Sequence, residues 1–300
     1  MKKVFVVMAH QLPDQLNVFI SQLLSLPDSE VFVHVNKRND EIKKQLIADK
    51  RVHVSDNNIP VVWASDSFIT AILNTMREVR ASKIDYDYLF LCSGQDLLVK
   101  NGIDEFLEAH KGEYFIDGYE EDKKRRAFLL YKWPSKYIRL IDNKLNPTKI
   151  MRRLRIELFK RGFPFFKKKV EYNTKDIVFY RNWFWSAMPK DIADYMLQFL
   201  DENPGFGSIY KDSLAADEGI FLTLIMNSPF KNRVKFNGNG RSHSLHYDGK
   251  RSNGHSTVIT SDEINDIESE NCFFARKFDS RIDKDVIRYF AKKLNVNCPF

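Results

Sequence analysis

Two short motifs hold the residues best suited to catalysis. The first, residues 216–223, reads ADEGIFLT, and the second, residues 274–279, reads FARKFD. A carboxylate such as Glu218 can act as a general base, and cations such as Arg276 and Lys277 can stabilise a phosphate leaving group. Together they suggest transfer of a group from an activated donor. Each has a plainer alternative, because an acidic pair at a helix start is often a cap and a basic pair is often surface.

A third motif, Asp85-Tyr86-Asp87, matches the D-x-D pattern with which many sugar transferases hold a divalent metal. It falls at the amino end of an expected strand, residues 88–92, whereas ligands of such sheets sit at the carboxyl end. We therefore interpret it as a solvated turn. At the carboxyl end stand Ser93 and Asp96, and Asp96 can bind hydroxyl groups of a ligand or cap its own turn.

The elements that must position these motifs alternate between strand and helix along the first half. Continuous apolar runs predict buried strands at residues 4–9, 31–35, 52–54 and 88–92, with helical spacing over 16–24 and 69–79 between them. This order predicts an α/β fold with a mostly parallel central sheet flanked by helices. His10 follows the first strand, so it joins Ser93 and Asp96 at the expected ligand-binding edge. Neither G-x-G-x-x-G nor G-x-x-x-x-G-K-[ST] follows a strand, which argues against dinucleotide and P-loop sites.

The second half is more elaborate. Strand signals recur at 112–116, 177–180 and 183–185, and helices are expected after Pro189 and from Asp217, where Asp217 would cap the helix. No internal repeat or Gly/Pro/Ser-rich linker interrupts the chain. The sequence thus predicts one domain, residues 1–300, with a nucleotide-binding half, 1–120, and an acceptor-binding and catalytic half, 121–300.

Composition narrows the class of protein. The chain has 300 residues, of which 43% are hydrophobic and 29% charged, enough for a substantial core. Three cysteines at long spacings predict neither a disulfide framework nor a cysteine–zinc site. No run of about 20 apolar residues predicts a membrane span, and the opening apolar run is too short for a signal peptide. We expect a cytoplasmic protein.

The net charge of +7 favours anionic partners. Much of it lies in residues 152–169, RRLRIELFKRGFPFFKKK, where basic and apolar residues interleave. Such a segment can be a solvated basic face, can lie on an anionic membrane, or can bind nucleic acid. A second basic stretch, residues 237–255, is rich in glycine and hydroxyl groups. Its histidines lack a nearby carboxylate or cysteine at metal-binding spacing, so we expect a loop that closes over an anionic ligand rather than a metal site.

Several segments resemble one family. They are VFVVMAHQLPDQLNVFISQLL, VFVHVNKR, VWASDS at 62–67, LFLCSGQDLLVKN, ADEGIFLTLIMNSP and FFARKFD. The chain is similar, over about residues 3–290, to the core-2/I-branching β-1,6-N-acetylglucosaminyltransferases and peptide O-xylosyltransferases of glycosyltransferase family 14. The resemblance implies a GT-A-type nucleotide-sugar-binding fold, inversion at the anomeric carbon and catalysis without a divalent metal.

The resemblance also implies roles for particular residues. Glu218 matches the catalytic base of the family, Lys277 matches a residue that binds the donor diphosphate, and Asp96 matches a residue near the donor. We place Ser93 and His10 on the donor side as well. A lysine at the diphosphate would replace a metal, which agrees with dismissing the D-x-D match.

The chain departs from the family pattern at three places. Residues 182–185 read NWFW where the family often has G-S-x-W, which implies a reshaped sugar pocket. The usual second diphosphate cation falls near Thr257, and Arg276, Arg251 or Lys250 can replace it. Asn36 and Leu98 stand where the family usually has Asp and Pro. On the acceptor side we expect the side chains of Trp185, Tyr247 and Asp217.

These patterns predict a metal-independent, inverting glycosyltransferase without a cofactor. The expected donor is UDP-GlcNAc, with UDP-xylose, UDP-glucose and UDP-galactose as alternatives. The absence of an anchor suggests a bacterial enzyme of surface polysaccharide synthesis, with a glycan or lipid-linked oligosaccharide acceptor. Residues 152–169 would hold it on the inner face of an anionic membrane. The alternative is a non-catalytic protein that binds anions or nucleic acid through that segment.

Overall fold

A computed structural model describes the chain apart from residues 63, 122–125, 134–146, 165–166, 237–244 and 253–254. Part of the 62–67 motif and most of the glycine-rich 237–255 stretch, including His243, therefore lie outside the described residues. So do Phe165 and Phe166 of the basic segment.

The centre of the molecule is a sheet of six strands in the order β3-β2-β1-β4-β7-β6. The first four are parallel, and β7 runs antiparallel to both of its neighbours. This order confirms the predicted α/β class with a mostly parallel central sheet. The strands are β1 (Lys3–Ala9), β2 (Ser29–Val35), β3 (Val52–Val54), β4 (Tyr88–Ser93), β6 (Phe115–Glu120) and β7 (Tyr180–Pro189).

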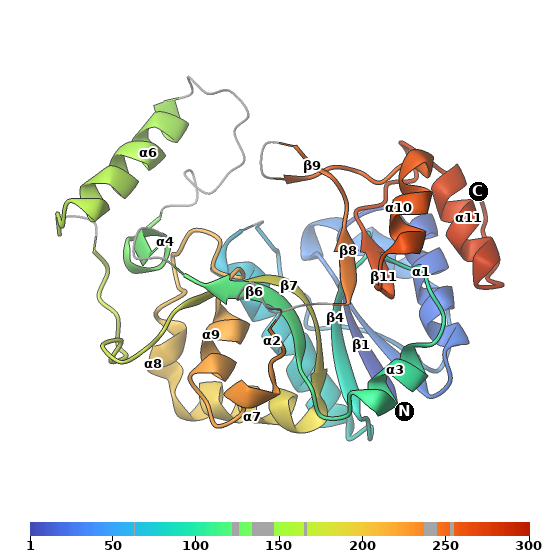
Figure 1. The fold of residues 1–300 in the computed structure, drawn as a ribbon, viewed down its shortest axis with the longest axis horizontal. Coiled ribbons are helices and arrows are strands. Elements are labelled where there is room, and N and C mark those ends of the chain that lie inside the picture. Colours follow the sequence, from blue (N-terminus) through green and yellow to red (C-terminus); the bar gives the residue numbers. More distant parts are fainter. Residues whose placement is uncertain (63, 122–125, 134–146, 165–166, 237–244, 253–254) are drawn as a thin grey trace.

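Helices cover both faces of this sheet (Figure 1). Alternate residues of a strand point to opposite faces, and in β1 both sets are apolar and buried, which explains its continuous apolar sequence. Helices α1 and α11 lie over one face, and α2, α7 and α9 over the other. The helices are α1 (Pro13–Ser25), α2 (Asp66–Ser82), α3 (Ile103–Ala109), α4 (Arg126–Leu130), α6 (Pro147–Lys160), α7 (Lys190–Glu202), α8 (Pro204–Gly207), α9 (Ile220–Met226), α10 (Ile264–Ser269) and α11 (Asp285–Lys293).

A second, small sheet packs over the face that α1 covers. It consists of β5 (Leu97–Leu98), β11 (Phe274–Arg276) and β8 (His246–Asp248), and a hairpin of β9 (Arg251–Ser252) and β10 (His255–Ser256) follows β8. The ring of Phe274 lies 5.8 Å from that of Phe90 in β4. This packing carries the FARKFD motif onto the central sheet.

Two predicted boundaries are wrong. The strand signal at 183–185 lies inside β7, which begins at Tyr180, so residues 177–179 precede the strand and Arg181 and Asn182 pair with β6 as part of it. The helix expected from Asp217 begins only at Ile220, with Gly219 as its cap and no side-chain capping bond. Residues 214–218 instead form turns whose backbone amides are bound elsewhere, such as that of Leu214 to the carbonyl of Phe128.

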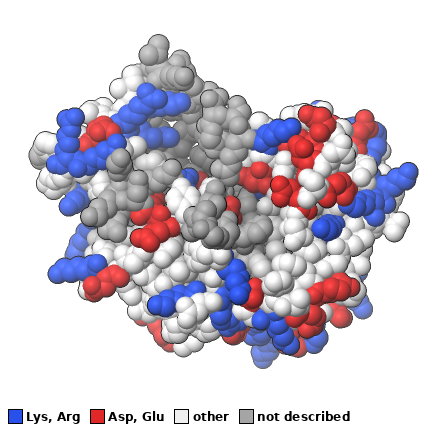
Figure 2. Space-filling model, viewed as in Figure 1, with Lys and Arg blue, Asp and Glu red and all other residues white. Residues whose placement is uncertain are grey.

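Helix α6 lies at the periphery, beyond the carboxyl end of β6, and packs against α4 (Figure 1). Lys and Arg side chains gather over it (Figure 2). Among the helices within the described residues, none is both long enough and apolar enough to cross a bilayer.

One glycine makes the pairing of β6 with β7 possible. A β-carbon on Gly118 would lie 2.3 Å from the backbone oxygen of Arg181 and 2.4 Å from a methyl carbon of Leu222. We expect Gly118→Ala to lower the free energy of unfolding by roughly 1–3 kcal/mol, because neighbouring backbone has to move. Urea denaturation measures this. Gly207→Ala is the control: its β-carbon meets nothing within 4 Å, so it should be neutral or stabilise by up to about 1 kcal/mol. Equal effects of the two changes would contradict the close approach.

Candidate active site

The candidate site lies at the edge of the sheet where β1, β4 and β6 end. His10 follows β1, and Ser93 ends β4. Because β7 is antiparallel, its first residues lie at this same edge: Glu120 of β6 pairs with Tyr180, and Leu91 of β4 pairs with Ser186. The topology thus brings together the ends of four strands from both halves of the chain.

Asp96 is the buried carboxylate at the centre of this edge. Its side chain has no exposure, and one carboxyl oxygen accepts a hydrogen bond from the backbone amide of Ser93 at 2.7 Å. The other oxygen lies 3.6 Å from Nε of Arg276. Burial raises the pKa of Asp96 to about 7, and the Arg276 charge works against that rise. Asp96 therefore fixes its own turn and also anchors the C-terminal motif.

Arg276 is held from three sides. Besides Asp96, its guanidinium contacts Asp248 of β8, with 3.0 Å between Nη1 and a carboxyl oxygen. Its central carbon lies 3.8 Å above the ring of Trp185 in β7, a close cation–π contact. This arginine therefore joins β4, β7, β8 and β11. Its role in donor binding remains a prediction, and its structural role is direct.

His246 belongs to the same buried cluster. The sequence alone did not predict that this histidine would lie beside Asp96. Its Nε2 lies 3.7 Å from Asp96, and its ring stacks on Phe274 at 4.8 Å between centroids. Burial, and then the charge of Arg276, lower the pKa of His246 to about 3. The imidazole is therefore neutral at physiological pH.

Within the described residues, one group of three side chains could hold a metal ion. Its members are Cys92, Asp96 and His246, whose possible ligand atoms all lie within 4.8 Å of one another. All three are buried. The guanidinium of Arg276 already places a positive charge against the carboxylate of Asp96. A cation beside a cation is unfavourable at such short range, so the trio fits poorly as a divalent-metal site.

Lys277 and His10 lie near each other at the donor side of the edge. Burial, and then the charge of Arg276, hold the pKa of Lys277 below its usual value. The pKa of His10 is lowered as well, first by loss of water contact and then by the charges of Lys277 and Arg281. An anion bound beside Lys277 would stabilise its charged form, whereas the lowered pKa of His10 favours the neutral imidazole.

Glu218 forms an ion pair with Arg181 of β7. Both side chains are partly exposed, at 26% and 21%, so the pair opens to solvent. Nothing in the residue pattern singled out Arg181. Only the family resemblance drew attention to this part of the chain, because residues 182–185 depart from the family pattern. Beside the pair, burial and then the charge of Glu218 raise the pKa of Asp217.

The spacing along β7 relates the two halves of the site. Arg181, Trp183 and Trp185 all lie on this strand, but its pairing with β6 shifts by two residues between Asn182 and Ser186, so the alternation of side chains is interrupted there. Arg181 binds Glu218 on one side of this irregular stretch, and Trp185 contacts Arg276 on the other. Trp183 lies between them, with its ring 6.0 Å from that of Tyr119 in β6. These two aromatic rings are a further feature that the sequence analysis did not single out.

The remaining predicted residues lie on the β8–β10 side. The hydroxyl of Tyr247 donates to Glu263 at 3.3 Å. The backbone of Arg251 pairs with Ser256 across the hairpin, and its side chain is outside the described set. Thr257, where the second cation was expected, binds the carbonyl of Lys250 through its amide at 2.8 Å. Lys250 therefore lies beside Thr257, the position at which the family usually has its second diphosphate cation.

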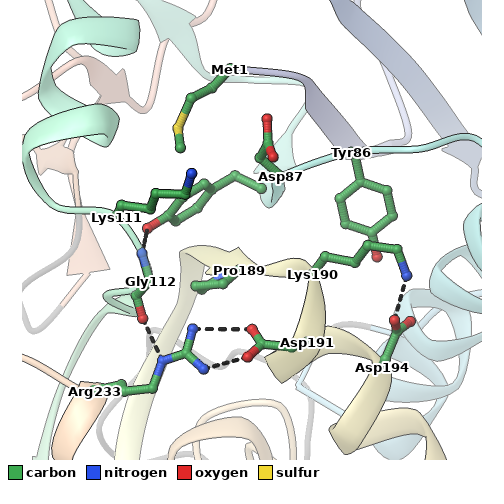
Figure 3. A pocket seen from close by; sticks show the side chains of 11 residues that line it. Met1, Tyr86, Asp87, Lys111, Gly112, Pro189, Lys190, Asp191, Asp194 and Arg233 are labelled. Atoms are coloured by element: carbon green, nitrogen blue, oxygen red, sulfur yellow. Dashed lines mark hydrogen bonds and ion pairs between the residues drawn. The ribbon is translucent and has the colours of Figure 1, made fainter.

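The D-x-D match lies at the opposite edge of the sheet, as predicted. Asp85 and Asp87 bind the side chain and the backbone amide of Lys2, each at 2.8 Å. A cavity of about 410 Å³ lies there, lined among others by Asp87, Asp191 and Arg233 (Figure 3). Arg233 binds Asp191 there and Lys190 binds Asp194, and the cavity lies at the edge of the sheet opposite to the candidate site.

A mostly parallel α/β sheet with a carboxylate and cations at its carboxyl edge is the arrangement of a group-transfer enzyme that takes an anionic donor. The sequence profile of the Core-2/I-Branching enzyme family matches residues 5–270. The chain belongs to this family of glycosyltransferases, and its mostly parallel central sheet flanked by helices is the α/β fold class expected from the sequence. Family membership favours an enzyme over a non-catalytic binding protein.

The curated relatives cover less of the chain. Xylosyltransferase oxt of Drosophila pseudoobscura pseudoobscura is 23% identical over 108 residues, 34% of this chain, and that of Drosophila melanogaster is 22% identical over the same length. The match spans only 12% of each fly protein.

Two solved structures show a distant likeness. Mouse xyloside xylosyltransferase 1 has a TM-score of 0.30 at 10% identity, over 77% of this chain and 83% of that one. The 4-diphosphocytidyl-2C-methyl-D-erythritol synthase of Anaerococcus prevotii has a TM-score of 0.33 at 10% identity, over 71% and 86%. Neither score is high enough to bear on function.

Removing the guanidinium of Arg276 should destabilise the protein. Arg276→Met leaves the buried Asp96 without its positive neighbour, and we expect a loss of about 3 kcal/mol in the free energy of unfolding. The folded-state pKa of Asp96 is already raised and would rise further. Ionisation then opposes folding more strongly in the variant, so the loss should be larger at pH 8 than at pH 5. Urea denaturation at both pH values measures this.

The matched control is Arg77→Met. Arg77 pairs with Asp201 at the surface, where both side chains are about two-fifths exposed, so its loss should cost less than about 1 kcal/mol and vary little with pH. If Arg276→Met were as mild as this control, the structural role of Arg276 would be refuted.

Proposed function

We propose that the protein transfers a sugar from a UDP-sugar to a hydroxyl group of a glycan, with inversion and without a divalent metal. The observation that carries this proposal is that β7 contacts both motifs at the carboxyl edge of the sheet, through Arg181 to Glu218 and through Trp185 to Arg276, as the family resemblance expects for base and donor. Family membership supports the reaction class, and the roles below are proposed from the resemblance and these contacts.

In the proposed reaction, Glu218 takes the proton of the acceptor hydroxyl while the hydroxyl oxygen attacks the anomeric carbon. The bond from this carbon to the diphosphate oxygen breaks, and its electron pair leaves with UDP. Attack from the face opposite to the leaving group inverts the configuration. Lys277 stabilises the charge that develops on the diphosphate.

Arg181 prepares the base for this step. Its ion pair holds the Glu218 carboxylate beside the start of β7. It is a positioning residue in this scheme. Asp96 acts in the same way on the donor side, because it fixes the turn after β4 in which Ser93 lies.

The metal-free part of the proposal rests on charge. Arg276 already places a positive charge beside Asp96, and Lys277 is proposed to bring a second one to the donor. Two fixed cations can therefore perform the electrostatic task that a D-x-D site with its metal performs in other sugar transferases.

Donor and acceptor are proposed from the resemblance. UDP-GlcNAc is the first choice, before UDP-xylose, UDP-glucose and UDP-galactose. Tyr247, Asp217 and Trp185 are the expected acceptor residues; the structure adds Trp183, which lies nearer to Glu218 along β7 and is only partly buried. We further propose a bacterial role in surface polysaccharide synthesis, in the cytoplasm at the inner face of the membrane, with a glycan or lipid-linked acceptor.

The base is tested by Glu218→Gln. Glutamine keeps the shape but cannot accept the proton, so the transfer rate should fall by about 10²–10⁴-fold while UDP affinity changes less than about threefold. The assay is UDP release with EDTA present, using the donor that a thermal-shift screen of nucleotide sugars selects. EDTA should leave the wild-type rate unchanged.

Glu120→Gln serves as the control, since Glu120 is an exposed glutamate at the same sheet edge and should keep the wild-type rate. The base assignment fails if Glu218→Gln releases UDP as fast as wild type. Loss of wild-type activity in EDTA would refute the metal-free mechanism separately.

The leaving-group role of Lys277 predicts a pH dependence. Its lowered pKa means that the free protein loses this charge at lower pH than an ordinary lysine would. UDP affinity should therefore begin to fall at a lower pH than the loss of charge of an ordinary lysine would cause, and Lys277→Arg, which stays charged, should flatten the fall. Calorimetric titration of UDP measures both. Lys277→Ala should bind UDP at least about tenfold more weakly at neutral pH. A wild-type affinity that Lys277→Ala leaves intact would exclude the role.

A further inference from the structure

Helix α6 shows an apolar face to solvent. Ile150, Met151 and Leu154 are 51%, 40% and 49% exposed, and Leu158 continues their row. Because successive residues of an α-helix are about 100° apart around its axis, these four side chains fall within a sector of about 100°. In water such a stripe is unfavourable, and an exposed stripe of this kind marks an interaction surface.

The opposite face of α6 fixes which way this stripe points. Ile156 and Phe159 are partly buried against a small cluster that contains Tyr131, Trp133 and Leu214. Arg155 donates to the carbonyl of Lys132 at 2.8 Å. The helix therefore cannot rotate to bury its outer stripe without giving up these contacts.

Lys149, Arg153 and Lys160 lie along one side of the outer stripe, with Glu157 between them and the stripe. The helix has five basic residues, Lys149, Arg152, Arg153, Arg155 and Lys160, and one acidic residue, Glu157, which pairs with Lys160 at 2.5 Å. Arg153 lies beside the stripe and is exposed, as is Arg161 just after the helix. Figure 2 shows Lys and Arg gathered over this part of the molecule.

We propose that this outer face of α6, residues Ile150, Met151, Leu154 and Leu158 with their basic border, docks on an anionic lipid bilayer. A central apolar stripe flanked by Lys and Arg is the arrangement of a helix that lies in the plane of a membrane interface. The apolar side chains enter the acyl boundary, and the basic ones meet anionic headgroups. Nucleic acid would contact the charges and leave the apolar stripe in water, so the bilayer fits better.

The docked helix would bring the candidate site to the membrane. The cluster beneath α6 includes Leu214 and, at its margin, Ala215, which lie in the turn just before Glu218. Figure 1 places α6 beyond the carboxyl end of β6, the site edge of the sheet. If the proposed function holds, the acceptor is then a glycan carried on a membrane lipid. Docking itself does not depend on that function.

The test is sedimentation of the full chain with phosphatidylcholine vesicles that contain or lack phosphatidylglycerol. Wild type should bind the anionic vesicles and lose binding as salt is raised. The variant Ile150→Ser with Leu154→Ser should bind at least about tenfold more weakly, because it lacks two apolar side chains that enter the acyl boundary when the helix docks. Both positions are exposed, so the fold and UDP binding should persist, which separates failure of docking from failure of the proposed function.

The matched control is Ile282→Ser, which removes an exposed apolar side chain outside α6, at 61% exposure. This variant should bind vesicles as wild type does. Three outcomes overturn docking: no wild-type binding to anionic vesicles, equal binding by the α6 variant, or binding of DNA without binding of vesicles. A dimer that the α6 substitutions dissociate, without vesicle binding, would assign the stripe to a second copy of the chain.

Discussion

The contact on which the site depends is the guanidinium of Arg276 between Trp185 and two carboxylates. It is the point at which β4, β7, β8 and β11 meet, and it lies in a buried environment where charge must be balanced. A lysine could supply the charge, but it lacks the planar fork that reaches two carboxylates and stacks on a ring at once. The two neighbouring cations of the FARKFD motif therefore have different surroundings. Arg276 links several elements of the fold, whereas Lys277 is predicted to bind the donor.

The reversed strand β7 is the second constraint. In a wholly parallel sheet the residues at the start of a strand would lie at the far edge, away from the ligand. Because β7 runs the other way, its first residues reach the site edge, and Arg181 can meet Glu218 there. The same reversal places Trp185 under Arg276. A single strand thus holds both the candidate base and the cation cluster at a fixed separation.

The sequence predicted what local pattern determines. Continuous apolar runs identified the parallel strands, and the position of Asp85 at a strand start correctly placed the D-x-D match at the wrong edge for a donor. Contacts between distant segments could not be predicted in this way. The late start of α9 follows from backbone bonds to residues near Phe128, and Arg181 gains its meaning only from an antiparallel register. The histidine at 246 was weighed as a metal ligand, yet burial and Arg276 keep it neutral beside Asp96.

The charge balance of the site also narrows the search for a second diphosphate cation. The charge of Arg276 is already opposed by Asp96 and Asp248, and the lowered pKa of His10 favours its neutral form. The segment 257–259 runs between the remaining candidates, since the amide of Thr257 binds the carbonyl of Lys250 and that of Ile259 binds the carbonyl of Lys277, both at 2.8 Å. This short bridge places the backbones of Lys250 and Lys277 on its two sides. Lys250, whose ammonium lies 3.4 Å from Asp266, its neighbour Arg251 and Arg276 therefore all stay predicted second cations for a diphosphate bound at Lys277.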